Sequence, residues 1–455
     1  MRLNRRELAS EARILLGLAW PVVLTSLNWT LLHLIDIAVV GHFSTHELGA
    51  LGAGRALTFI TIVMGIAALS GVLVFSARAD GAGTPERCGD FLRSGLLFGG
   101  AMGTVFMVVL LLWAEPLIVL IGVAPDLVSS GSRVVQAMAL AYPPQLVMTA
   151  AAYFLEGVSR PRPAMVVNLA MLPLNGILAW AWVGGHWGLP AAGAAGAALA
   201  TATVSLFGAA AMLVAVWIVP RAGELNVHEA GMAAWRRAVR GVPALFRFGL
   251  VPGLASGLEL AGFSWLIALS TQLGAVTAAA FQTVFSLHNF AFAFALGMGS
   301  AAGVRVGNAV GAGDPRAGLD RSIIAVVMAV MCMGVIAGVY MLTARPLVSL
   351  FSADPAVLSV GVAMLLMFAP WMLFDGVQVV FVYALRSMGD QVVAGVNGVI
   401  AFFFVTGGLG WLLMRLDYGA AGLVAAIAAG VVAAAILQAA RMWIITRRVV
   451  PRTSG

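Results

Sequence analysis

Lysine is absent from this chain of 455 residues, in which all 26 basic residues are arginine. Its absence excludes chemistry that needs a lysine side chain, such as that of a phosphate-loop ATPase or a retinal Schiff base. Cysteine is also scarce, and the two cysteines, Cys88 and Cys332, lack the spacing of metal ligands. We interpret both as small packing residues.

Charge of either sign is rare as well. Only 10% of the residues are charged and 61% are apolar, and the mean hydropathy is +1.00. Apolar runs of about 20 residues recur along the chain, each long enough to cross a bilayer as a helix. The composition therefore predicts a polytopic membrane protein. The net charge of +7 does not indicate nucleic acid as a partner, because the arginines follow the expected topology.

The apolar runs predict an all-α protein with twelve transmembrane helices in two six-helix lobes. The predicted domains are an N-terminal lobe over 1–220, a cytoplasmic linker over 221–245 and a C-terminal lobe over 246–455. The approximate spans are 14–40, 48–76, 92–114, 131–156, 163–184, 190–220, 246–271, 274–302, 321–343, 356–385, 390–415 and 419–448.

The two halves repeat one another. WAEPLIVLIGVAP (113–125) matches TARPLVSLFSADP (343–355) at an offset of 230, and GAGTPER (81–87) matches GAGDPRA (311–317) at the same offset. Six spans is an even number, so both copies insert the same way up, which predicts a pseudo-two-fold axis along the membrane normal. This organisation is common in transporters.

The arginines predict the orientation. Of the 26, 22 fall on the side that holds both termini, and such an excess marks the cytoplasmic side. Four others, Arg55, Arg133, Arg345 and Arg415, fall on or toward the other side. Both termini are therefore expected in the cytoplasm, with the basic N-terminal stretch as a leader into the first span and not a cleaved signal peptide.

Three carboxylates lie within spans. Of the 19 acidic residues, only Asp36, Glu259 and Asp375 are not at span ends or in loops, and no arginine lies in register nearby to neutralise them. A carboxylate without a basic partner in a membrane either takes up a proton or holds a cation. Switching between these states is what an ion-coupled exporter requires. The alternative for any one of them is a permanently protonated acid that donates to a backbone carbonyl.

The stretches DIAVVGHFSTHELGALG, EGVSRPRPAMVVN (156–168) and RSMGD (386–390) resemble the multidrug and toxic compound extrusion (MATE) family over almost the whole chain. Glu259 and Asp375 make the chain most similar to the NorM branch. The resemblance implies two six-helix lobes around a V-shaped cavity. It also implies export of cationic or amphipathic compounds in exchange for inward Na+ or H+, with Glu259 and Asp375 as a candidate Na+ site.

The same resemblance implies further site residues. Asn175 matches an asparagine that the family uses beside the first-helix aspartate. Ala179 stands where the family commonly has a second Asn or Asp, which makes a proton easier to defend than a sodium ion at Asp36. Gln282 corresponds to a glutamine near bound drug in the NorM branch.

Trp371 stands where the family often has a tyrosine. It lies one helical turn before Asp375 and is therefore expected on the same face. A tryptophan ring can cover a bound organic cation.

The expected function is a secondary active multidrug efflux antiporter of the bacterial inner membrane. It is expected to be a monomer in the lipid bilayer, without a cofactor beyond the coupling ion. The alternative is a flippase for a lipid-linked precursor from the same wider superfamily, although such proteins usually carry extra spans and more basic cavity residues. An enzyme is not expected, because the GAGD of 311–314 lies in a predicted turn and no HExxH motif occurs.

Overall fold

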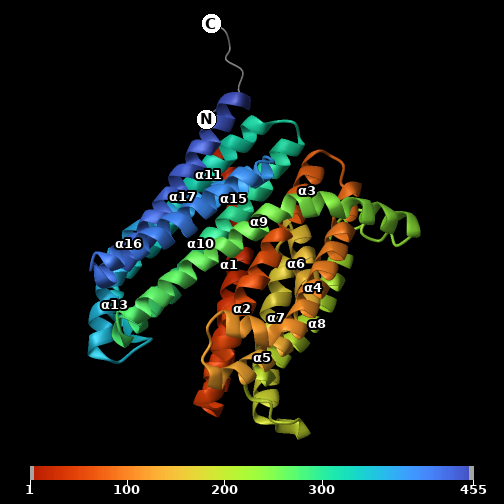
Figure 1. The fold of residues 1–455 in the computed structure, drawn as a ribbon. Helices are drawn as coiled ribbons and strands as arrows, with labels where there is room; N and C mark the ends of the chain where they lie inside the picture. Colours follow the sequence, from red (N-terminus) through yellow and green to blue (C-terminus); the bar gives the residue numbers. More distant parts are fainter. Residues whose placement is uncertain (1–4, 450–455) are drawn as a thin grey trace. The chain divides into compact units, whose positions relative to one another are not determined.

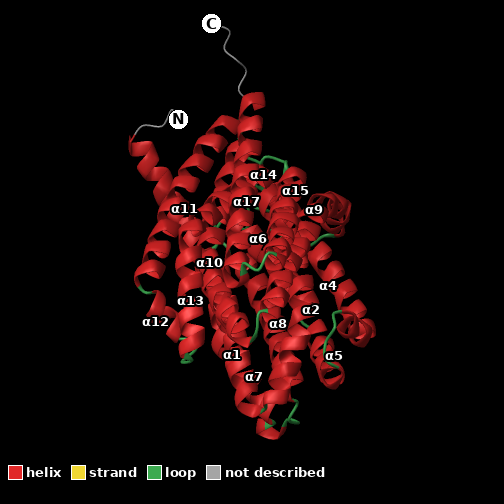
Figure 2. Cartoon of the chain, turned by 60° about the vertical axis from the view of Figure 1, so that its left-hand side comes forward, coloured by secondary structure: helices red, strands yellow, loops and turns green. Residues whose placement is uncertain are grey.

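The computed structural model describes residues 5–449, and these residues form helices without any β-strand (Figure 1 and Figure 2). The α-helices are α1 Arg5–Phe43, α2 Thr45–Ala68, α3 Ser70–Gly81, α4 Glu86–Leu120, α5 Pro125–Ala139, α6 Tyr142–Gly157, α7 Arg162–Gly184, α8 Gly193–Trp217, α9 Met232–Gln272, α10 Ala275–Gly311, α11 Pro315–Leu342, α12 Ala344–Ser349, α13 Pro355–Phe368, α14 Leu373–Ser387, α15 Gln391–Gly398, α16 Leu409–Arg415 and α17 Gly419–Val449. Three further helical segments are η1 His186–Gly188, η2 Ala369–Met372 and the π-helical η3 Val399–Gly408. Helices suit this composition because each backbone group finds its partner within the segment and needs no water.

Eleven helical stretches of the described chain are long and apolar enough to cross a membrane. The remaining predicted span, 131–156, is divided between α5 and α6, each too short to be counted alone. Pro143 and Pro144 open α6 and have no N–H to donate, which explains the interruption. Leu140 and Ala141 keep the chain helical through tighter bonds to residues three positions back. The two short helices therefore form one interrupted crossing, and the predicted fold class is confirmed.

The internal repeat is visible in the helix boundaries. The pair α2 and α3 covers 45–81, and α10 covers Ala275–Gly311 at the same offset of 230. The break between α5 and α6 has its counterpart in η2, a short 3-10 segment containing Pro370 between α13 and α14. Prolines thus interrupt equivalent crossings, although Pro370 is displaced by three to four residues from the positions equivalent to Pro143 and Pro144.

Contacts divide the chain into two compact units. One unit is Leu24–Gly253, and the other combines Met1–Val23 with Leu254–Gly455; we call them the 24–253 unit and the 254–455 unit. Both boundaries fall inside helices, so α1 and α9 each belong to both units. Pro21 in α1 lies three residues before Leu24, and Pro252 in α9 lies two residues before Leu254, where the units change. Each proline removes one helix hydrogen bond. The predicted lobe boundaries of 1–220, 221–245 and 246–455 stay a prediction.

The beginning of α1 is held in the 254–455 unit by an ion pair. Arg305 in α10 donates two hydrogen bonds of 2.6 Å to the carboxylate of Glu11. Arg321 in α11 lies 3.7 Å from the same carboxylate. Because Glu11 is only 7% exposed, two guanidinium groups compensate one buried charge.

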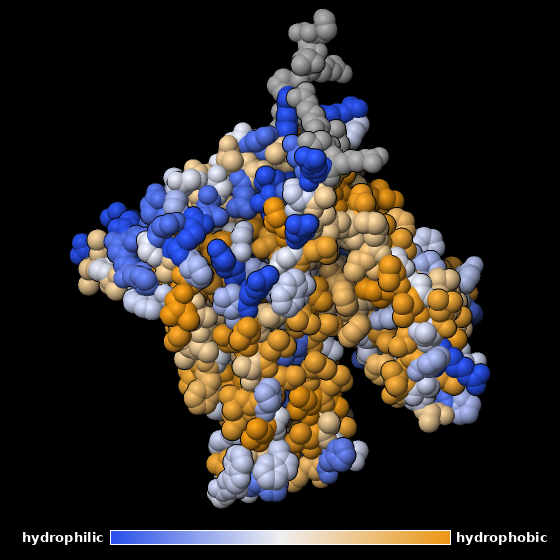
Figure 3. All heavy atoms as spheres, turned by 180° about the vertical axis from the view of Figure 1, so that it is seen from behind, coloured by the Kyte–Doolittle hydropathy of each residue, from blue (hydrophilic) through white to orange (hydrophobic). Residues whose placement is uncertain are grey.

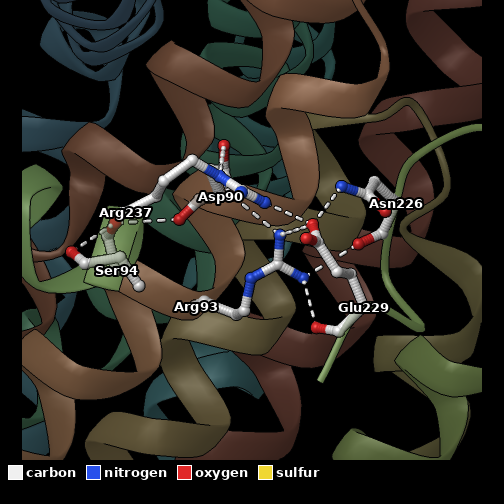
Figure 4. A network of polar contacts seen from close by, with 7 residues as sticks. Asp90, Arg93, Ser94, Asn226, Glu229 and Arg237 are labelled. Atoms are coloured by element: carbon white, nitrogen blue, oxygen red, sulfur yellow. Dashed lines mark hydrogen bonds and ion pairs between the residues drawn. The ribbon is translucent and has the colours of Figure 1, made fainter. Parts of the chain in front are cut away.

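The linker is a folded element and not a loose chain (Figure 4). Arg93 in α4 donates to the carbonyl oxygens of Asn226 at 2.8 Å and Glu229 at 3.1 Å. It also donates to Asp90 at 2.8 Å. Arg237 in α9 is paired with both Asp90 and Glu229. The linker and the first turns of α9 are therefore fixed to α4.

Hydrophilic side chains gather at one corner of the face in Figure 3, at its upper left, where the linker and the beginning of α9 lie. Below that corner the helices present mainly apolar side chains. Exposed apolar side chains such as Leu112, Leu206 and Val214, at 67%, 63% and 59%, lie on spanning helices. A lipid environment accounts for such exposure, because lipid tails are as apolar as these side chains.

Candidate functional site

The three predicted acids lie on three different helices. Asp36 is on the part of α1 that belongs to the 24–253 unit, whereas Glu259 on α9 and Asp375 on α14 belong to the 254–455 unit. Asp36 is 2% and Asp375 is 1% exposed, and Glu259 is partly buried. Each needs a compensating group, because a charge removed from water without a partner is costly.

The Asp36 cluster combines polar side chains from four helices. Arg55 Nη2 in α2 donates to Asp36 Oδ2 at 2.5 Å. Asn175 Nδ2 in α7 donates to Asp36 Oδ1 at 2.8 Å. Thr201 Oγ1 in α8 lies 3.5 Å from Asp36 Oδ2 and 3.4 Å from Asn175 Oδ1. The result is a buried, hydrogen-bonded ion pair.

The expectation that no arginine neutralises Asp36 is wrong. Helix α1 ends at Phe43 and α2 begins at Thr45, so the chain turns back after a single residue. Asp36 is seven residues before that end (43 − 36), and Arg55 is ten residues after that start (55 − 45). With a helical rise of about 1.5 Å per residue, the two side chains reach similar depths. The sequence signal was an arginine well inside an apolar run.

Two other residues near Asp36 were not among the predicted site residues. Thr201 was missed, because one hydroxyl in the Ala-rich stretch ALATATVS gives little signal. His33 contributes its carbonyl oxygen, which accepts a hydrogen bond of 3.2 Å from Arg55, and its ring packs edge-on against Phe59. Ala179 is buried and adds no oxygen atom to the cluster.

Asp375 forms a second polar pair with a residue that the sequence analysis missed. His288 Nε2 in α10 lies 2.9 Å from Asp375 Oδ2, and both side chains are buried. The other ring nitrogen of His288 is buried without a hydrogen-bond partner in the described chain. Rings of Phe368 and Phe292 lie 5.1 and 5.8 Å from the imidazole. The pair therefore lies in largely aromatic surroundings.

Glu259 has no ion-pair partner among the described residues, although the charge of Arg386 in α14 acts on it. No hydrogen bond or salt bridge joins it to another residue within 5–449. Its carboxylate lies against Gly398 in α15, where even an added Cβ would collide with it. Glycine at 398 thus makes room for the acid. No direct contact joins Glu259 to Asp375 in the described chain, so the structure does not bring the two acids into one hydrogen-bonded pair.

The two cargo candidates of the second half have exposed side chains. Gln282 is exposed on α10. Trp371 is 41% exposed and stacks on Phe374 at 6.2 Å, whereas Asp375 points inward to His288. Trp371 lies in the 3-10 segment η2 and not in α14, and its exposed side chain differs in environment from the buried Asp375. The expected shared face stays a prediction.

The three acids belong to no cluster of metal-ligating side chains in the described chain, and they do not line the two pockets beside Trp265 and Trp411. No group of three or more His, Cys, Asp or Glu side chains that could hold a metal ion occurs among the described residues. A pocket of about 440 Å³ on the 254–455 unit is lined by apolar residues of α9, η3 and α16, including Trp265, Phe403 and Trp411. A sodium ion at Glu259 or Asp375 would therefore depend on neutral oxygen ligands.

Many apolar helices with carboxylates inside the spans define an integral membrane protein of the transporter class. The chain belongs to the MatE family of multidrug and toxic compound extrusion transporters, whose family model matches residues 21–181 and 254–413. The family model matches once in each half, in agreement with the internal repeat.

Relatives with curated names carry the NorM designation or one like it. The chain is 32% identical over 409 residues to the probable multidrug resistance protein NorM of Caulobacter vibrioides, covering 88% of this chain and 84% of that protein. It is 26% identical over 447 residues to the multidrug resistance protein PmpM of Pseudomonas aeruginosa, covering 96% and 92%. The predicted NorM-like assignment is confirmed.

Solved structures have the same fold. The eukaryotic MATE transporter AtDTX14 superposes with a TM-score of 0.85 at 19% identity, over 97% of this chain and all of that one. An outward-facing multidrug resistance MATE family transporter of the MOP superfamily superposes with a TM-score of 0.84 at 17% identity, over 96% of each chain. At these identities the likeness establishes the fold alone.

Proposed function

We propose that the protein is a secondary active multidrug efflux antiporter of the bacterial inner membrane, which exports cationic or amphipathic organic compounds in exchange for H+ or Na+ by alternating access. The observation that carries the proposal is the set of three carboxylates, Asp36, Glu259 and Asp375, inside the spans of a MATE chain. The names of the relatives support multidrug compounds as the cargo class. Transport coupled to an ion gradient needs neither a cofactor nor a catalytic residue.

The three acids do not have equal roles in this proposal. Asp36 already has a guanidinium partner and Asp375 has an imidazole partner. Glu259 has no such direct partner, since Arg386 acts on it without forming an ion pair, and its position against Gly398 leaves it with the greatest need for a proton or a cation. We therefore assign the first binding of the coupling ion to Glu259, with Asp375 as the second acid of the same unit.

The remaining candidates take different parts. Asn175 orients the carboxylate of Asp36 and need not contact cargo. Gln282 and Trp371 have exposed side chains that can reach a bound compound. The indole ring of Trp371 offers a π-face to an organic cation, and the amide of Gln282 offers a hydrogen bond.

Efflux from proteoliposomes tests the proposal. With a fluorescent organic cation and an imposed pH or sodium gradient, we expect Glu259→Gln and Asp375→Asn each to lose roughly 10-fold or more of the gradient-driven rate. The control is Asp354→Asn, since Asp354 caps α13 by accepting from Ala356 N at 2.8 Å and an amide oxygen can keep that bond. Wild-type rates in the Glu259 and Asp375 double variant would reject the assignment. Transport of a lipid-linked precursor without transport of the dye would favour a flippase.

A further inference from the structure

We infer that Arg55 is a built-in cation of the Asp36 site: its guanidinium fills the place that a sodium ion would otherwise take. Two of its nitrogens bind oxygen atoms of α1, at 2.5 Å to Asp36 Oδ2 and at 3.2 Å to the carbonyl oxygen of His33. The guanidinium of Arg55 stays protonated under physiological conditions, so its positive charge remains at the site. The site is therefore occupied as long as α1 and α2 keep this packing.

The oxygen atoms that gather at the Asp36–Arg55 ion pair have the chemistry of a cation site. Asp36 Oδ2 and the carbonyl oxygen of His33 accept from Arg55. The hydroxyl of Thr201 lies 3.5 Å from Asp36 Oδ2 and 3.4 Å from the side-chain oxygen of Asn175, so oxygen atoms of three helices gather at the ion pair. Carboxylate, amide, hydroxyl and carbonyl oxygens are the ligands that hard cations prefer. Their number and kind explain why a positive charge is stable there at all.

The positive charge of Arg55 is enough to balance the negative charge of Asp36. The side chains of Asp36 and Arg55 are 3% and 14% exposed, so solvent does little to screen either. Asp36 supplies a single negative charge, and Ala179 adds none. A sodium ion entering beside the pair would meet the repulsion of a guanidinium at close range in a medium of low dielectric constant. The structure thus excludes sodium from Asp36 in the conformation described.

Removal of the guanidinium should convert the cluster into a sodium site. In Arg55→Gln the negative charge of Asp36 loses its counter-ion, while the oxygen atoms of Asn175, Thr201 and His33 remain. The relevance of the Asp36 site to transport rests on the proposed function. The inference is tested by equilibrium binding to the protein, so failure of efflux and failure of this inference are distinguishable.

The experiment measures binding of radiolabelled Na+ to the purified full chain in lipid nanodiscs. Each protein is compared with its own Asp36→Asn version, so that sodium bound at Glu259 or Asp375 cancels in the difference. We expect no Asp36-dependent binding in the wild type. In Arg55→Gln we expect Asp36-dependent binding of Na+, with an affinity that falls roughly 10-fold or more when Asp36 is changed to Asn in the same background. Na+ should also raise the unfolding temperature of Arg55→Gln through Asp36, but not that of the wild type.

Two control variants separate charge from disturbance. Arg55→Lys keeps a positive charge and should gain no sodium site. Arg133→Gln makes the same substitution at an exposed arginine of α5 and should behave as the wild type. Asp36-dependent sodium binding in the wild type would overturn the inference without any Arg55 variant. A folded Arg55→Gln protein without a new sodium site would overturn it as well.

Discussion

Asp36 and Arg55 compensate each other inside the protein, and neither is stable there alone. The 2.5 Å contact between them joins a carboxylate that is 3% exposed to a guanidinium that is 14% exposed. In such a pair the cost of removing both charges from water is large, so the net gain is small, yet loss of one partner is severe. Arg55 already leaves its Nε atom buried without a partner in the described chain, which makes Asp36 its main compensation.

A double-mutant cycle measures this coupling. Asp36→Asn leaves the guanidinium of Arg55 buried without a counter-ion and should cost about 3 kcal/mol in the free energy of unfolding. Arg55→Gln in sodium-free buffer should cost a similar amount, because it leaves the carboxylate alone. The double variant removes both charges and should lose less than the sum, by roughly 1–3 kcal/mol. Unfolding in detergent supplies the measurement, and additive losses would contradict the pairing.

Helix α4 organises the connection between the two halves of the sequence. Arg93 is only 3% exposed and hydrogen-bonds two linker carbonyl oxygens as well as Asp90. Ser94 adds a hydrogen bond of 2.9 Å to the carbonyl oxygen of Ala238 in α9. The network in Figure 4 thus satisfies backbone groups of a segment that has no regular helix of its own.

Arg93→Met removes these donors and should free the linker. The carbonyl oxygens of Asn226 and Glu229 lose a partner, as does Asp90, and we expect a loss of about 2–3 kcal/mol in the free energy of unfolding. Limited proteolysis within 221–231 should become faster at the same time. The matched control is Arg87→Met, which changes an exposed arginine of the same helix. Equal proteolysis of both variants and the wild type would show that the network does not hold the linker.

At the scale of the whole molecule, the arginines and the apolar helices together predict how the chain lies in the membrane. The predicted cytoplasmic location of the linker depends on the arginine excess, and the corner that holds the linker is strongly hydrophilic (Figure 3). Leu225, an obvious position for a topology probe within the linker, is 1% exposed. Position 452, near the C-terminus, would be a second position for a topology probe, but it lies outside the described residues.

Cysteine labelling tests this topology at accessible positions. In a background with Cys88 and Cys332 replaced, Glu224→Cys lies in an exposed part of the linker, with a side chain that is 63% exposed. An impermeant maleimide should leave it unmodified in intact cells and modify it in inverted vesicles. Asp126→Cys, exposed at the start of α5, should show the opposite pattern. Labelling of Glu224→Cys in intact cells would reverse the predicted orientation.

The sequence by itself determined the class of protein, the helix content, the repeat and the three carboxylates inside spans. Hydropathy is a sum over neighbouring residues, so 20 apolar residues predict a span whatever they pack against. The repeat is a comparison of letters at an offset of 230. Asp36, Glu259 and Asp375 were found because an acid within an apolar run needs no partner to be conspicuous.

Only the tertiary structure decided which groups meet. Each residue turns a helix by about 100°, so the face that a side chain presents depends on how neighbouring helices pack and where they are interrupted. Arg55 reaches Asp36 because α2 turns back along α1, and His288 reaches Asp375 from another helix. Trp371, in the 3-10 segment η2, is exposed, whereas Asp375 in α14 is buried. Helix packing determines which charged side chains meet. It depends on residues far apart in the chain, so it cannot be obtained by summing over neighbouring residues as hydropathy can.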